Sequence, residues 1–232
     1  IKAQGIRPQV IVEPTCGLGN FIIAALLTFD SIEDVYGIEI YKPYLDALNE
    51  KLQTFGSSLD YINVHLYHEN IFDFDFRQIT ENVNGRVVLA IGNPPWVTNS
   101  KLSEIGSDNL PIKTNFKKTK GLEAITGKAN FDIAEYISIQ IIEKFSDENV
   151  HFAFLLKNSV IKNLVYEQKA GKASLSNIAQ YNIDAQKEFG VSVSAALLSM
   201  RLFGGHERIC QVFNFYTKSS LNSFGWVKDK FV

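Results

Sequence analysis

The chain has 232 residues, of which 46% are hydrophobic and 21% are charged, and its net charge is −2. This composition is typical of a globular protein with a sizeable core, and it gives no global sign of a polyanionic partner. Apolar runs such as residues 87–91 are too short to cross a bilayer, and no signal segment opens the chain. Two cysteines are too few for a disulfide framework or a zinc site, and the four histidines lack metal-ligand spacing. We therefore expect a cytoplasmic protein with no membrane segment and no metal site.

A glycine turn follows the first apolar run, residues 9–12, and apolar residues at helical spacing follow the turn. Strand, glycine turn and helix in this order form the first half of a nucleotide-binding type of α/β fold. Gly17 and Gly19 allow a ligand to approach the backbone, and the helix that begins near Gly19 points free N–H groups at the same place. The acidic Glu13 at the strand tip favours an amine-bearing ligand over a pyrophosphate. A purely structural helix cap is the alternative.

Polar residues also follow the next two predicted strands, residues 34–40 and 61–67. Glu39 ends the first of them, where a carboxylate can accept hydrogen bonds from both hydroxyls of a ribose. Asn70 and Ile71 follow the second, where they could contact the exocyclic amine and the ring face of a purine. A solvated strand end at Glu39 and a polar loop at Asn70 are the structural alternatives.

The fourth predicted strand, residues 86–91, ends abruptly at Asn93, Pro94, Pro95 and Trp96. Two consecutive prolines cannot continue a sheet ladder, so the backbone leaves the sheet here. In an open α/β sheet, ligands bind just beyond the carboxyl ends of the strands. An amide side chain, stiffened carbonyls and an indole face at that point suit one flat, amino-bearing group. The alternative is a proline-rich turn with an aromatic lid.

The next segment, residues 97–129, is poor in apolar residues and carries a cluster of positive charge. From Lys113 to Lys128 it contains five lysines and one glutamate, a net charge of +4. Because it follows the proline turn directly, it could reach a phosphate backbone and add affinity without base specificity. A solvated charged loop is the common alternative. The candidate phosphate contacts are Lys113, Lys117, Lys118 and Lys120.

The remainder of the chain predicts further strands and helices of one α/β domain. We expect helices at residues 131–145 and 157–168, strands at 150–156, 176–183 and 194–203, and a possible edge strand at 209–216. Residues 218–232 give no clear signal.

Taken in this order, the glycine turn, Glu39, the Asn70 corner and the Asn-Pro-Pro-Trp turn resemble the class I S-adenosylmethionine-dependent methyltransferases. More narrowly, the chain resembles the gamma-type adenine-N6 DNA methyltransferases of restriction-modification systems, in which the cofactor motif precedes the catalytic motif. The resemblance covers about residues 9–203. It implies an α/β, Rossmann-like class I methyltransferase fold: a mostly parallel sheet of seven strands, the last antiparallel, with helices on both faces.

The resemblance also implies S-adenosylmethionine as cofactor and roles for individual residues. Asn93, Pro94, Pro95 and Trp96 match the catalytic tetrad, and Trp96 with Phe189 would pack on the target base. Residues 131–137 match the start of a helix that covers the cofactor. The family usually has an aspartate where this chain has Asn70, which can still accept a hydrogen bond from the cofactor's adenine amine but brings no charge. The implied cofactor-binding residues are Glu13, Pro14, Thr15, Gly17, Gly19, Phe21, Glu39, Ile40, Asn70 and Ile71.

Two features of the family are missing: a segment before the glycine turn and a large C-terminal recognition domain. We assign residues 1–217 to a catalytic domain with a truncated N-terminal segment and a substrate loop at 97–129. Residues 218–232 are then a tail that starts a missing segment or recognition domain. The implied partners are double-stranded DNA and a separate or C-terminal target-recognition domain.

The implied activity is methyl transfer to the exocyclic N6 amine of a flipped adenine in DNA, as the modification part of a restriction-modification system. The chemistry of the turn also suits an RNA base amine or a protein glutamine amide. A non-catalytic methyltransferase-like binding domain is a third alternative.

Overall fold

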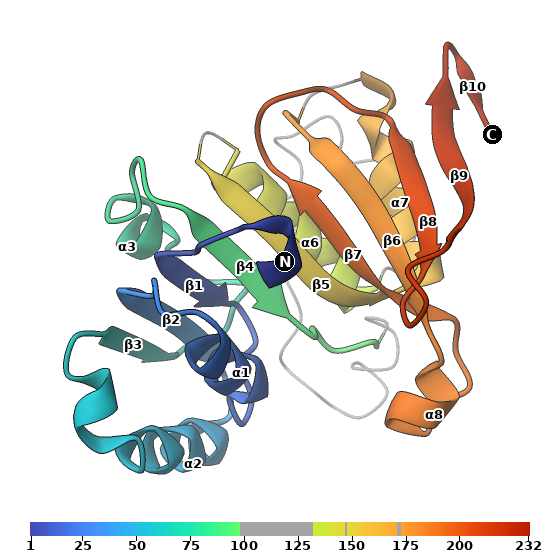
Figure 1. The fold of residues 1–232 in the computed structure, drawn as a ribbon. Helices are drawn as coiled ribbons and strands as arrows, with labels where there is room; N and C mark the ends of the chain where they lie inside the picture. Colours follow the sequence, from blue (N-terminus) through green and yellow to red (C-terminus); the bar gives the residue numbers. More distant parts are fainter. Residues whose placement is uncertain (98–131, 147, 171–172) are drawn as a thin grey trace.

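The computed structural model describes residues 1–97, 132–146, 148–170 and 173–232, which form one sheet with helices on both faces (Figure 1). The strands are β1 (Val10–Glu13), β2 (Asp34–Glu39), β3 (Asn63–His68), β4 (Val88–Gly92), β5 (Val150–Lys157), β6 (Ser176–Ile183), β7 (Ala195–Arg201), β8 (Ile209–Asn214), β9 (Ser220–Val227) and β10 (Lys230–Phe231). The helices are α1 (Asn20–Thr28), α2 (Lys42–Gln53), α3 (Arg77–Thr80), α6 (Ile133–Lys144), α7 (Asn158–Glu167) and α8 (Ala185–Phe189).

The strand order of the sheet is β3-β2-β1-β4-β5-β7-β6-β8-β9-β10. The first five strands in the chain are parallel to one another, and β7 is antiparallel to both β5 and β6. This confirms the predicted α/β class with its mostly parallel sheet and antiparallel seventh strand. The predicted count of seven strands is wrong, because β8, β9 and β10 continue the described sheet beyond β6. For the same reason β8 is not an edge strand.

Two apolar layers hold the sheet between its helices. On one face, α6 and α7 pack through residues such as Ile137, Ile141 and Leu164 against the central strands. On the other face, α1 and α2 pack through Ile22 and Leu48 against β1, β2 and β4. Strand β5 contributes to both layers because its side chains alternate between the two faces of the sheet. Phe152 and Phe154 face α6, while Ala153 faces the opposite side.

Strand β9 is tied to the rest of the domain by Trp226. The Trp226 side chain is buried, and its indole N–H donates a hydrogen bond of 2.7 Å to the carbonyl of Tyr166 in α7. Its ring centroid lies 5.2 Å from that of Phe231 in β10. The segment 218–232, which gave no clear signal in the sequence, thus packs on the same sheet and helix as the predicted catalytic domain.

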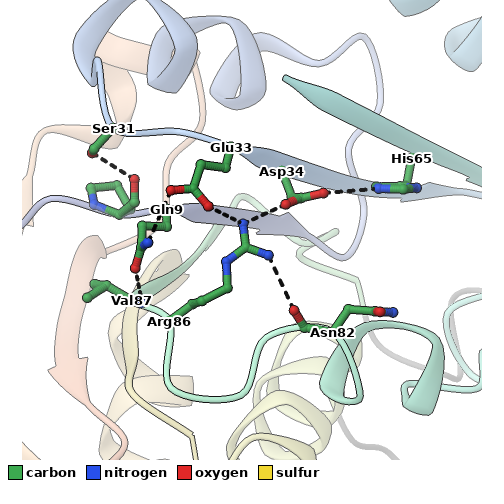
Figure 2. Close-up of polar contacts among 9 residues, drawn as sticks. Gln9, Ser31, Glu33, Asp34, His65, Asn82, Arg86 and Val87 are labelled. Atoms are coloured by element: carbon green, nitrogen blue, oxygen red, sulfur yellow. Dashed lines mark hydrogen bonds and ion pairs between the residues drawn. The ribbon is translucent and has the colours of Figure 1, made fainter. Parts of the chain in front are cut away.

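A polar network joins the amino ends of the central strands (Figure 2). Arg86, just before β4, donates to Asp34 at 2.5 Å and to Glu33 at 3.1 Å. Gln9, just before β1, donates to Glu33 and accepts from the backbone N–H of Val87, both at 3.2 Å. Burial alone would raise the pKa of Asp34, but hydrogen bonds from Arg86, Asn63 and His65 outweigh burial and lower that pKa below its usual value.

No helix in the described ranges is both long enough and apolar enough to cross a membrane.

Replacing Trp226 with alanine is expected to lower the free energy of unfolding by about 3 kcal/mol, because a buried indole and its hydrogen bond are lost. Urea unfolding measures the change. Leu221→Ala is the matched control, since Leu221 lies on the same strand with 52% of its surface exposed. Equal effects of the two substitutions would contradict the packing role of Trp226.

Arg86→Met is expected to lower stability at neutral pH by about 1–2 kcal/mol, because Asp34 loses its charged partner. The lowered pKa of Asp34 means that its contribution is complete above about pH 3.9 and is lost as pH falls through the lower pKa of the folded state. The difference between variant and wild type should therefore shrink in acid, as followed by urea unfolding at several pH values.

Arg77→Met is the control for that series, because the ion pair of Arg77 with Asp75 is exposed. It should change stability little at any pH. A constant difference between Arg86→Met and wild type down to acid pH would show that the Asp34 charge is not involved.

Candidate active site

A cavity of about 370 Å³ lies at the carboxyl edge of the sheet, beyond the tips of β1, β2, β3 and β4. The end of β2 and the segments that follow all four strands form its wall, and Ile133 and Ile137 of α6 close one side. This is the position at which open α/β sheets bind ligands. The lining residues are Pro14, Thr15, Ile38, Glu39, Ile40, Glu69, Asn70, Ile71, Phe72, Asn93, Pro95, Val97, Ile133 and Ile137.

The glycine turn after β1 packs tightly against α2. Gly17 and Gly19 have φ angles of 52° and 72°, in the left-handed region that favours glycine. A Cβ atom added at Gly19 would lie 2.1 Å from Leu48 Cδ1, so a larger residue there would force the buried Leu48 side chain to move. The sequence therefore requires glycine at this position for packing as well as for conformation.

Glu39 connects the glycine turn to the end of β2. Its Oε2 accepts a hydrogen bond of 2.9 Å from the Gly17 N–H, and its Oε1 accepts one of 2.8 Å from the Tyr41 N–H. A carboxylate has about four acceptor positions, so each oxygen keeps one for a ligand in the cavity. The backbone-holding role of Glu39 was missed by the sequence reasoning, because no pattern signals a bond between residues 22 positions apart.

Glu13 lies behind the cavity rather than in its wall. It is only 2% exposed, and its Oε2 accepts a hydrogen bond of 3.3 Å from the Ile22 N–H. Burial raises the pKa of Glu13 well above its usual value, the Ile22 N–H opposes this, and the charge of Glu39 raises the pKa further. A Cβ at Gly92 would lie 3.8 Å from Glu13 Cγ, so this carboxyl group sits beside the end of β4. Its predicted contact with an amine-bearing ligand stays a prediction.

Asn70 holds its own loop while it lines the cavity. Its Oδ1 accepts a hydrogen bond of 3.1 Å from the Phe72 N–H, and its Nδ2 donates one of 3.2 Å to Asp73. The bond from Phe72 is that of an Asx turn, and one acceptor position on Oδ1 remains for a ligand. Ile71 is buried beside it and presents an apolar face.

The turn after β4 brings the predicted acceptor side to the same cavity. Asn93 and Pro95 are exposed and line it, whereas Pro94 is buried. The Trp96 indole N–H donates a hydrogen bond of 3.2 Å to the Leu155 carbonyl of β5. The rings of Trp96 and Phe189 meet edge to face, with centroids 5.9 Å apart.

The cavity thus collects eight of the predicted site residues: Pro14, Thr15, Glu39, Ile40, Asn70, Ile71, Asn93 and Pro95. Seven others lie outside its lining: Glu13, Gly17, Gly19, Phe21, Pro94, Trp96 and Phe189. Ile133 and Ile137 belong to the helix start expected to cover a cofactor. The lining also includes Ile38, Glu69, Phe72 and Val97, which directly flank predicted residues and could have been found from that adjacency. Lys113, Lys117, Lys118 and Lys120 lie outside the described residues.

The wall of the cavity suits a nucleoside. Glu39 supplies acceptors for hydroxyl groups, while Ile38, Ile40 and Ile71 supply apolar surface for a flat ring. The buried Oγ1 of Thr15 has no hydrogen-bond partner in the described structure, which leaves a polar atom at the wall for a ligand to satisfy. Among the described residues, no group of three or more His, Cys, Asp and Glu side chains is arranged to hold a metal ion.

No protein-family model matches the chain. The type II methyltransferase M.NspV of Nostoc sp. is 42% identical to it over 193 residues, which are 83% of this chain and 39% of that protein. The chain therefore spans about two fifths of the length of this relative.

Solved structures show the same fold. The methyltransferase subunit of a type I restriction-modification system from Streptococcus thermophilus superimposes with a TM-score of 0.62 at 14% identity, over 97% of this chain and 45% of that subunit. A protein from Listeria monocytogenes, described as a class I S-adenosylmethionine-dependent methyltransferase, superimposes with a TM-score of 0.51 at 13% identity, over 87% of this chain and 55% of that one.

Superposition over 97% and 87% of this chain shows that these two structures share its fold. Identity of 42% over most of the chain is too high for a likeness of fold alone and shows common descent with a methyltransferase. The chain belongs to the methyltransferase family of M.NspV and has the fold of the class I S-adenosylmethionine-dependent methyltransferases.

Proposed function

We propose that this chain transfers the methyl group of S-adenosylmethionine to the N6 amine of an adenine in DNA, as the catalytic part of a restriction-modification methyltransferase. The observation that carries the proposal is that Asn93 and Pro95 line the same cavity as Glu39 and Thr15. One side of the cleft is suited to hold the cofactor, and the other to hold an amine beside it.

On the cofactor side, the residues of the chain bind and orient. When bound, S-adenosylmethionine supplies an electrophilic methyl group, so the protein's task is alignment. The free acceptor positions of Glu39 suit the ribose hydroxyls, and Ile40 and Ile71 suit the faces of the adenine ring. The charged Glu39 is already held by two backbone N–H groups, so it needs little reorganisation to accept a ligand.

On the acceptor side, the turn after β4 favours a nucleophilic amine. The amino group of adenine is a poor nucleophile because its lone pair is delocalised into the ring. Hydrogen bonds from that amine to Asn93 Oδ1 and the Pro94 carbonyl would favour a tetrahedral nitrogen and stabilise the positive charge that develops on it. Pro95 restricts the backbone that carries this carbonyl. No general base is required, because the proton can leave to water after transfer.

Trp96 and Phe189 suit a base that has been rotated out of a duplex. An adenine inside a duplex cannot reach the cleft, so it must be flipped. The edge-to-face pair of Trp96 and Phe189 offers aromatic surface close to Asn93, and stacking on such surface compensates part of the cost of unstacking.

DNA is the proposed acceptor because of the relatives. The Nostoc protein is named a type II methyltransferase, and the Streptococcus protein is a subunit of a restriction-modification system. The basic segment from Lys113 to Lys128 adds local positive charge for a phosphate backbone. Because the chain spans 39% of the Nostoc protein, we further propose that target recognition is supplied by a region or partner beyond this chain. An RNA base amine or a glutamine amide are the acceptors to be tested against DNA.

Asn93→Ala is expected to keep cofactor binding and to lower methyl transfer about 100- to 1,000-fold, since one polar contact to the developing charge is lost. The measurement is incubation with labelled S-adenosylmethionine and separate DNA, RNA and protein pools, followed by nucleoside analysis for N6-methyladenine. Asn49→Ala, which removes an exposed amide from α2, is the matched control. Near-wild-type labelling by Asn93→Ala would contradict a catalytic role for Asn93. Label found in protein alone would contradict the proposal that the acceptor is a nucleic acid.

Glu39→Gln is expected to weaken S-adenosylmethionine binding about 10- to 100-fold. An amide group would place an N–H donor against the N–H of Gly17 or Tyr41 and would remove the negative acceptor for the ribose. Isothermal titration calorimetry measures the dissociation constant. Glu50→Gln, at an exposed position of α2, should bind as the wild type does. An unchanged affinity in Glu39→Gln would place the cofactor elsewhere.

A further inference from the structure

The turn that carries Asn93 has two anchors on the side away from the glycine turn. The Trp96 indole N–H bonds to the Leu155 carbonyl at 3.2 Å, and the Val97 carbonyl accepts a hydrogen bond of 2.9 Å from the Ile133 N–H. Asn93 and Pro95 themselves are exposed, and within the tetrad only Pro94 between them is buried. The position of the turn therefore depends on where Leu155 and Ile133 lie relative to each other.

An ion pair joins those two anchor points. Lys157 lies two residues after Leu155 at the end of β5, and Asp132 directly precedes Ile133 at the start of α6. The Lys157 ammonium pairs with Asp132 Oδ2, and the two side chains are only 20% and 10% exposed. Asp132 Oδ1 also accepts a hydrogen bond of 3.0 Å from the Ala134 N–H and so caps α6.

These contacts form a closed ring that runs from Trp96 through Leu155 and Lys157 to Asp132, then through Ile133 and Val97 back to Trp96. Two of the connections in this ring are hydrogen bonds and one is the ion pair, and the others are covalent bonds of the backbone.

We propose that Asp132 and Lys157 are positioning residues for methyl transfer, which fix the Asn93–Trp96 turn through this ring. The proposal rests on the proposed function, because it assigns the turn to the acceptor side of the cleft. Neither residue lines the cavity.

The alternative role for the pair is a structural brace between β5 and α6. Those elements are already held by buried apolar residues, among them Phe154, Ile133 and Ile137. Loss of the pair should leave both packed in place. The added motion should then occur in the Asn93–Trp96 turn. A displacement of about 1 Å there would lower the rate about 100-fold.

Three substitutions separate these roles. Asp132→Asn keeps an oxygen that can cap α6 but removes the charge, and Lys157→Met keeps the apolar stem of lysine. Lys157→Arg restores a cation. We expect Asp132→Asn and Lys157→Met each to lower kcat about 10-fold, with less than about a twofold change in the dissociation constant of S-adenosylmethionine. The double variant should be no worse than either single variant, because both remove one interaction. Lys157→Arg should recover most of the rate.

Arg77→Met is the matched control, because it removes an ion pair exposed at α3, whose residues are absent from the cavity wall. It should leave kcat unchanged. Independent, additive losses from Asp132→Asn and Lys157→Met, or no recovery in Lys157→Arg, would overturn the proposal.

A second readout does not depend on the acceptor. In a Trp226→Phe background Trp96 is the remaining tryptophan of the chain, so the decay of tryptophan fluorescence anisotropy reports its local motion. Asp132→Asn and Lys157→Met should increase the amplitude of fast motion of Trp96, whereas Arg77→Met should not. A lowered unfolding midpoint with unchanged anisotropy and kcat would establish a brace and overturn positioning. If the wild type methylates RNA or protein in place of DNA, the proposed function fails, while anisotropy and kcat on that acceptor still test the ring.

Discussion

The candidate active site depends on the position of β1 between β2 and β4. The chain runs from β1 to β2 and β3 on one side, and then returns to place β4 on the other side, all in parallel. In these registers Val10 is level with both Asp34 and Val88, so the three strands end at one edge. The segments that leave that edge diverge, and a crevice opens between them. The glycine turn and the Asn93 turn are therefore neighbours by topology. At the opposite edge, Arg86 and Gln9 tie the starts of the same strands together.

The polar residues at these strand tips hold the backbone as well as facing the cavity. Glu39 binds the N–H groups of Gly17 and Tyr41, and Asn70 binds that of Phe72. Each side chain is thereby fixed before a ligand arrives, which reduces the entropy lost on binding. The Asn70 amide is already bonded to Phe72 and Asp73. It offers a ligand a neutral acceptor, where a carboxylate would offer a charged and stronger one.

Much of the fold and the cleft could be predicted from the sequence, because strong local signals mark them. Short apolar runs ended by glycine, glutamate or proline identify β1, β2 and β4 and set their tips at one edge. Strand β9 gave no such signal, since Ser220, Asn222 and Ser223 are exposed and its buried Trp226 is held by a helix distant in sequence. The short helix α8 was missed because five residues show no period. The position of Glu13 behind the cavity wall could not be predicted from the sequence either, because the burial of its carboxyl group depends on how Gly92 and α1 pack around it.

The two sides of the cleft differ in how firmly they are held, and this difference fits their tasks. The glycine turn is packed against Leu48 and bonded to Glu39, which suits its proposed role in binding a cofactor of constant shape. The turn after β4 presents Asn93 and Pro95 to solvent and is held at Trp96 and Val97. An acceptor that must enter the cleft needs open space beside Asn93. The contacts that restrain the turn must therefore lie on its side away from the cleft. Two prolines limit the backbone from within, and contacts to β5 and α6 limit it from outside. Since methyl transfer to an amine relies on alignment more than on proton transfer, the placement of this turn, rather than any titrating group, should set the rate of the reaction.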